Sequence, residues 1–85
     1  MAVNPESELS HDIRGRVLSD QGQYEQALAS FQTSVILNPQ RHWTWYRIGL
    51  THEALGDKVE ATTAYGHALS IKPDFVEAQQ KRQQL

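Results

Sequence analysis

The stretch RIGLTHEALGDKVEATTAYGHALSIKP at residues 47–73 carries the same landmark residues as the earlier stretch IRGRVLSDQGQYEQALASFQTSVILNP at residues 13–39. A shift of thirty-four residues places Gly15 on Gly49. The same shift aligns Gly22 with Gly56, Ala27 with Ala61, Phe31 with Tyr65, and the prolines Pro5, Pro39 and Pro73. A fixed period of this length is the sequence signature of a stacked-repeat protein.

Apolar residues within each unit recur with the period of a helix. In the first unit, one face collects Tyr24, Ala27, Leu28, Phe31 and Val35. Glycine permits a helix to end, and a proline disfavours helical geometry in the residue before it, so each unit is predicted to contain two helices. We predict helices at residues 6–20, 24–37, 42–55, 58–71 and 74–84.

Two glycines fall in the middle of predicted helices, where glycine costs about 1 kcal/mol relative to alanine. They are Gly15 and Gly49, which occupy the same place in the two units. We expect a neighbouring helix to approach closely at both. The aligned alanines Ala27 and Ala61 would supply the matching small surface.

The second unit resembles the tetratricopeptide repeat family in residue types and spacing. It carries Trp45, Ile48, Gly49, Ala61, Tyr65, Ala68 and Pro73, with Gly56 in the turn. The first unit departs at His11 and Arg14, and the second at His52 and Lys58. The resemblance implies an all-α fold, an α-α superhelix (solenoid) of two helix-turn-helix repeats with a C-terminal capping helix. It implies packing roles for Gly15, Ala27, Phe31, Trp45, Gly49, Ala61, Tyr65 and Ala68.

The expected organisation has four parts: a tail at 1–6, a first repeat at 7–40, a second at 41–73 and a capping helix at 74–85. Asp74 is expected to cap the last helix, with Glu77 reaching back as in a capping box. The rest of that helix is polar, which is typical of the end of such an array. At the other end, Val3–Pro5 resembles the close of a preceding repeat. The polar His11 and Arg14 fit equally well a first helix without a neighbour, so both interpretations stay open, as does whether the chain belongs to a longer array.

Composition limits the classes of function. Hydrophobic residues are 39% of the 85 and charged residues 21%, as in a globular domain. The net charge of −2 and the scattered basic residues argue against nucleic-acid binding, and no apolar run is long enough to cross a membrane. The absence of cysteine suits a reducing compartment, and we expect a cytoplasmic location.

The sequence contains no motif that indicates an enzyme. The four histidines lack metal-ligand spacing, no glycine-rich phosphate loop is present, and nothing assembles a catalytic triad. We expect neither a metal nor a cofactor. His11 and His52 are interpreted as histidines at the edge of the core.

In the family that the chain resembles, the first helices of successive repeats line a concave groove. The resemblance therefore implies a protein–protein interaction module that holds a peptide or protein segment there. The alternative is a module that associates with itself, as a homo-oligomer or a helix-swapped dimer. The groove residues implied are Leu9, Asp12, Ile13, Arg16, Trp43, Tyr46, Arg47, Leu50 and Lys81.

Trp43 stands out because Trp45 already occupies the family's packing position. Two residues apart on a helix means about 200° of rotation, so both indoles cannot bury in one contact. Trp43 is either a binding residue or a cover for a neighbouring helix or turn. The subset of the family that clamps a C-terminal carboxylate has a lysine where this chain has Asp12, which disfavours that clamp. Arg16, Arg47 and Lys81 are interpreted either as a basic stripe or as ordinary solvated charges.

Overall fold

The computed structural model describes residues 7–85, which form a stack of helices and, in that range, no strand. The helices are α1 (Glu8–Asp20), α2 (Tyr24–Leu37), α3 (His42–Ala54), α4 (Lys58–Ile71) and α5 (Val76–Gln84). The all-α solenoid expected from the sequence is confirmed. The tail at 1–6, with its Val3–Pro5 segment, lies outside the described residues, and the unit boundaries remain predictions.

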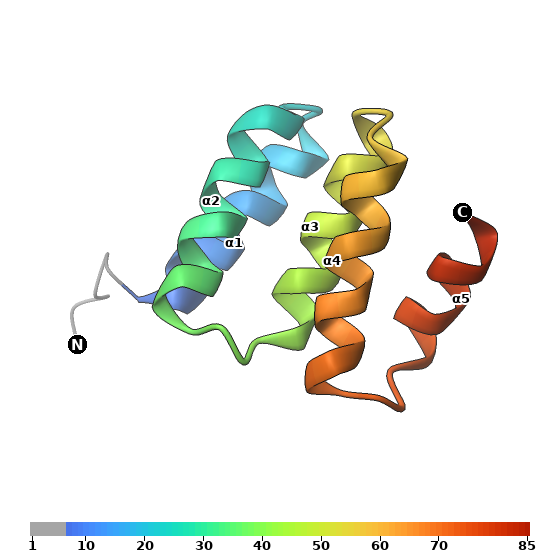
Figure 1. Ribbon diagram of the computed structural model, residues 1–85. Coiled ribbons are helices and arrows are strands. Elements are labelled where there is room, and N and C mark those ends of the chain that lie inside the picture. Colours follow the sequence, from blue (N-terminus) through green and yellow to red (C-terminus); the bar gives the residue numbers. More distant parts are fainter. Residues whose placement is uncertain (1–6) are drawn as a thin grey trace.

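The helices pair along the chain and the pairs stack. α1 packs on α2 and α3 on α4, and α2–α3 and α4–α5 contacts join the pairs into one body. Figure 1 shows α1 and α3 in one layer and α2 and α4 in the other, with α1 and α5 at opposite ends of the stack. We call the side of α1 and α3 the groove face, and the side of α2 and α4 the outer face.

The first helix of each repeat ends in the same hydrogen-bonded turn. Gly22 has a φ of 78°, and the amide of Gln23 bonds to the carbonyl of Leu18 at 2.9 Å. Gly56 has a φ of 82°, with the amide of Asp57 on the carbonyl of His52 at 2.8 Å. Both are Schellman motifs, which need a residue that tolerates positive φ after the helix. These turns send each chain segment back along its own repeat.

The mid-helix glycines lie directly under aromatic rings. A Cβ at Gly15 would come within 2.5 Å of Phe31 Cε1, and one at Gly49 within 2.7 Å of Tyr65 Cδ1. The close approach expected at both positions is therefore confirmed. Phe31 and Tyr65 were expected to fill the space beside the opposing alanines, and their rings are the groups that lie nearest to the two glycines.

Two apolar clusters form the core, one for each repeat seam. Ala27, Phe31 and Val35 meet Ile48 and Ala64 in the first cluster. The second contains Ala61, Tyr65, Ala68, Phe75 and Ala78, all at most 2% exposed. Trp45 packs against both clusters and so ties the repeats together.

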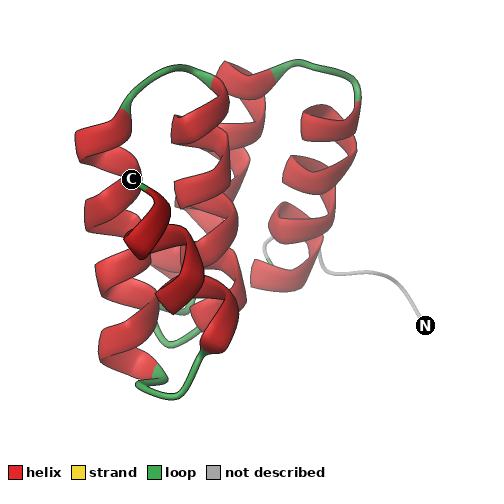
Figure 2. Cartoon of the chain, turned by 90° about the vertical axis from the view of Figure 1, so that its right-hand side faces the viewer, coloured by secondary structure: helices red, strands yellow, loops and turns green. Residues whose placement is uncertain are grey.

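The last helix covers the end of the stack beside α4, as Figure 2 shows from that end. Ala78 is fully buried against the second cluster, and the exposed residues of α5 are polar except for Val76. The expected capping box is wrong. α5 begins at Val76 with Phe75 as its N-cap, and no side chain caps it. Asp74 lies in the preceding turn because Phe75 is drawn into the core, where it is 2% exposed.

Candidate protein-binding surface

The groove face has a shallow hollow where α1 and α3 lie side by side. Its volume is about 260 Å³. Three of the residues expected in the groove, Arg16, Arg47 and Leu50, lie along it. The remaining lining residues are Ser19, Asp20, Phe31 and Thr51.

Next to this hollow, Trp43 lies on a support of aromatic rings. Its ring meets Phe75 edge-on at 4.7 Å and Tyr46 at 5.9 Å between centroids. Yet 42% of the residue is exposed. Trp43 thus partly covers the start of α5, as one interpretation expected, and still presents an indole surface to solvent. We call Trp43, Tyr46 and Phe75 the aromatic shelf.

Arg47 borders the shelf and is held in place from two sides. Its guanidinium lies 5.8 Å from the centre of the Trp43 ring, within cation–π range. Its Nη1 lies 3.6 Å from Asp12 Oδ2. Burial lowers the pKa of Arg47; Asp12 opposes that shift, and Arg16 and Arg41 add to it. Arg41 and Arg47 share the single buried carboxylate of Asp12, and Arg16 adds a third positive charge near Arg47.

Asp12 does not offer its charge to a ligand, so its assignment to an open groove surface is wrong. The residue is 2% exposed, and its Oδ1 accepts a hydrogen bond of 2.8 Å from Thr44 Oγ1. Thr44 in turn accepts one of 3.2 Å from Arg41 Nε, and Arg41 also lies 3.8 Å from Asp12. We call Asp12, Arg41, Thr44 and Arg47 the seam network. A buried carboxylate persists because it is paired and hydrogen-bonded in this way.

Lys81 pairs with an acidic neighbour instead of continuing a basic stripe. Its Nζ lies 3.1 Å from Glu53 Oε2, and the same oxygen accepts a hydrogen bond of 2.8 Å from the Tyr65 hydroxyl. Burial, and then this hydrogen bond, raise the pKa of Tyr65 far above its usual value. Lys81 thus links α5 to α3.

Apolar side chains on α1 complete the groove face. Leu9 is 52% exposed and Ile13 47%, both as expected for accessible residues. Val17 continues their row one turn further and is 50% exposed, although the sequence did not single it out. Its signal was the spacing at i, i+4 and i+8, which places all three on one helical face. Arg41 and Phe75 were also missed, because their roles depend on contacts with distant residues.

The histidines show no sign of a metal site. Over residues 7–85, no three histidine, aspartate or glutamate side chains gather closely enough to hold an ion. His52 is half-buried, as its interpretation as a core-edge residue requires, and its Nδ1 lies 3.7 Å from Asp57 Oδ2. His67 stacks on Trp45 with 4.4 Å between ring centres.

Family comparisons agree with this repeated geometry. A model described as "TPR repeat" matches residues 15–56, and one described as "Tetratricopeptide repeat" matches residues 44–75. This chain belongs to the tetratricopeptide repeat family. Its paired Gly15–Phe31 and Gly49–Tyr65 contacts are the packing units of two tetratricopeptide repeats.

Solved tetratricopeptide structures share the fold over almost the whole chain. A crystal structure of MamA superposes with a TM-score of 0.90 at 26% identity, covering 93% of this chain and 46% of that one. A second MamA structure gives 0.89 at 26% identity, covering 93% and 43%. Both MamA chains are more than twice as long as the matched region.

A curated relative comes from Triticum aestivum and is named Hsp70-Hsp90 organizing protein. It is 30% identical over 73 residues, which are 86% of this chain and 13% of the relative. The tetratricopeptide chain therefore spans a small part of that protein. As a family of interaction modules, tetratricopeptide repeats support protein partners for this chain in general terms. Among the described helices, none is long and apolar enough to cross a membrane.

Proposed function

We propose that this tetratricopeptide module binds a peptide or protein segment along its groove face, without catalysing a reaction. The contact residues are the exposed part of the aromatic shelf and the hollow beside it. They comprise Leu9, Ile13, Arg16, Trp43, Tyr46, Arg47, Leu50 and Lys81. Trp, Tyr and Arg are the residue types that contribute most to binding at protein interfaces.

The exposed yet supported Trp43 is the observation that carries this proposal. Large aromatic side chains that are fixed before binding lose little conformational entropy when a partner arrives. Phe75 and Tyr46 hold the ring from below, and Arg47 lies across it. Trp45, by contrast, packs against both core clusters and stacks on His67.

The name of the wheat relative links that protein to Hsp70 and Hsp90, but the residues here favour another kind of segment. Asp12 stands where the carboxylate-clamping subset of the family has a lysine, and its charge is buried. We therefore propose a segment that inserts an apolar or aromatic side chain beside Trp43. The surplus arginines favour an acidic residue next to it. The cytoplasmic location expected from the sequence stays a prediction.

The experiment compares two tagged variants in affinity capture, using a partner first identified with the wild-type chain. Replacing Trp43 and Tyr46 with alanine removes the shelf's exposed surface. We expect affinity to fall by at least about tenfold, since a hot-spot residue contributes about 2 kcal/mol or more.

The matched control is Val59→Ala, because Val59 is 77% exposed and lies on α4. It should bind as the wild type does. Circular dichroism checks that both variants keep their helices. Unchanged affinity in a folded Trp43→Ala, Tyr46→Ala variant would remove the groove assignment.

A further inference from the structure

A second hollow lies on the outer face, away from the aromatic shelf. It measures about 350 Å³ and lies between α2 and α4, with α3 beneath. Buried Val35, Ile48 and Ala64 form its apolar floor, and Ile36 stands at its rim, 77% exposed. A hollow of this size holds one or two large apolar side chains.

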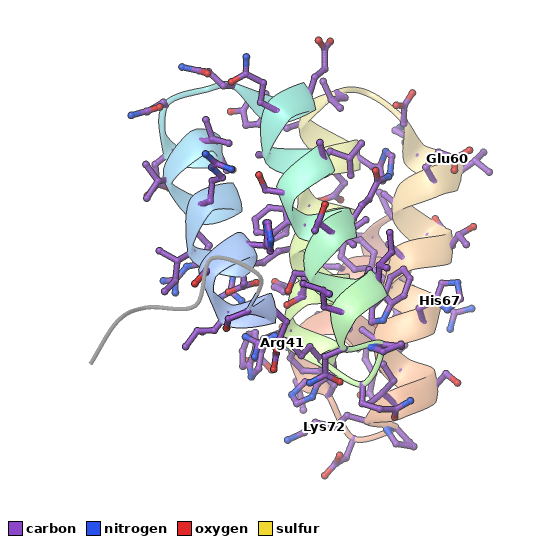
Figure 3. The ribbon with its side chains drawn as sticks, turned by 90° about the vertical axis from the view of Figure 1, so that its left-hand side faces the viewer. Arg41, Glu60, His67 and Lys72 are labelled. Atoms are coloured by element: carbon purple, nitrogen blue, oxygen red, sulfur yellow. The ribbon has the colours of Figure 1, made fainter. Side chains whose placement is uncertain are left out.

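The walls of this hollow carry a stacked ring pair and one carboxylate. Trp45 and His67 stack at an interplanar angle of 21°, and both line the space. Glu60, from the first turn of α4, is the acidic residue among its lining residues. Figure 3 shows Glu60 and His67 on the side of α4 that faces away from α1. The hollow thus has the chemistry to accept an apolar side chain next to a positive charge.

Comparing α1 with the equivalent positions of α3, thirty-four residues later, shows that one surface of α1 lacks a neighbouring helix. Thr51 and Ile48 on α3 are 2% and 4% exposed, because the first repeat covers them. Their counterparts on α1 are Val17 and Arg14, and both are exposed. α1 therefore presents the uncovered apolar row of Leu9, Ile13 and Val17.

The charges beside this row complement the hollow. Arg14 and Arg16 flank the row on α1 and are both exposed. Among the contacts between described residues, neither forms an ion pair. An apolar row with flanking arginines matches an apolar hollow with a glutamate at its wall.

We propose that the α1 row of one chain docks into the α2–α4 hollow of a second copy, with an arginine beside Glu60. The contact is heterologous, because the two chains contribute different surfaces. A bound pair therefore leaves one α1 row and one hollow open. Association then grows with concentration instead of stopping at a closed dimer. One helix face buries less than the roughly 800 Å² per partner of a standard interface, so the association is weak. This proposal does not rest on the proposed function. The two surfaces share Leu9, Ile13 and Arg16, but Trp43 and Tyr46 take no part in this contact.

Sedimentation velocity of the full 85-residue chain over a wide concentration range tests this directly. The wild type is expected to exceed the mass of the 9.7 kDa monomer, by about twofold or more at the highest concentration. Val17→Glu on α1 and Ile36→Glu at the hollow each place a carboxylate in the contact, so each variant alone should stay monomeric. Val59→Glu, equally exposed but outside the hollow, should behave as the wild type.

Mixing the Val17→Glu and Ile36→Glu variants distinguishes this contact from a symmetric one, in which both chains would use the same surface. Val17→Glu keeps its hollow and Ile36→Glu keeps its α1 row, so the mixture should form one-to-one dimers. Circular dichroism confirms that each variant is folded. A wild type that stays monomeric, association that survives either variant, or a mixture that fails to dimerise would each overturn the proposal. None of these outcomes bears on binding at Trp43.

Discussion

A glycine beneath an aromatic ring is the contact that defines each repeat at the scale of single residues. Gly15 meets Phe31 and Gly49 meets Tyr65 with no room for a methyl group. Gly66, also within a helix, has nothing within 4 Å of where its Cβ would lie. Glycine destabilises a helix interior. Packing explains Gly15 and Gly49 in spite of this cost, but it does not explain Gly66.

Gly49→Ala is predicted to destabilise the fold. Forcing a methyl group into the Tyr65 ring costs about 1–3 kcal/mol, against about 1 kcal/mol gained in helix propensity. Gly66→Ala is the matched control and should raise the free energy of unfolding by about 0.5–1 kcal/mol, because its helix gains without a clash. Urea denaturation measures both. Equal effects of the two substitutions would contradict the packing explanation.

Tyr65 is predicted to make stability depend on alkaline pH. Its pKa is raised in the folded chain, so above the ordinary value of 10.0 the unfolded chain loses a proton that the folded chain keeps. The free energy of unfolding should therefore fall as pH rises above 10.0, by up to about 1.4 kcal/mol per unit from this group.

Tyr65→Phe removes the titrating hydroxyl and its bond to Glu53. The variant should be less stable near neutral pH but show a shallower loss between about pH 9 and pH 11. Chemical denaturation at several pH values gives both slopes. Parallel slopes for variant and wild type would exclude Tyr65 as the cause.

At the scale of elements, the seam network fixes α1 against α3. Asp12 on α1 accepts the hydroxyl of Thr44 on α3, and Arg41 and Arg47 approach the same carboxylate. The network also holds Arg47 beside Trp43. One buried acid thereby contributes to both the packing of the repeats and the shape of the groove face.

Asp12→Ala is predicted to lower the free energy of unfolding by about 1.5–3 kcal/mol, since it leaves charged partners without their acceptor. Thermal and urea unfolding provide the measurement. Asp20→Ala, an exposed aspartate on the same helix, should change stability by less than about 0.5 kcal/mol. Equal, small changes in the free energy of unfolding for Asp12→Ala and Asp20→Ala would show that the seam network does not stabilise the fold.

The sequence predicted most of the elements because the repeat imposes the same contacts twice. All five helices begin and end within about two residues of the expected positions, and the glycine contacts were anticipated. The cap of α5 was not, because burial of Phe75 outweighs the local capping signal of Asp74 and Glu77.

The candidate site was less predictable than the fold. Spacing along helices placed Trp43, Arg47 and Leu50 together on one face. The burial of Asp12 depends on Thr44, which is thirty-two positions away in the sequence. The position of Arg41 depends on the conformation of the loop before α3. Local pattern carries no information about such pairings, so a buried ion network was taken for an open groove residue.

The whole molecule presents two unlike faces, each marked by a tryptophan. Trp43 lies in the aromatic shelf on the groove face, and Trp45 lines the hollow of the outer face, where its Nε1 donates to the carbonyl of Pro39 at 2.9 Å. A two-dimensional NMR spectrum resolves their indole N–H signals. Each signal therefore reports on one face of the stack.

Titrating the isotope-labelled chain with its captured partner segment tests whether that segment binds on the groove face. Chain concentration is held low and constant, so that self-association does not change. We expect the Trp43 indole signal to shift or broaden in a saturable manner, while that of Trp45 stays in place. A saturable change at Trp45 with Trp43 unmoved would contradict binding on the groove face.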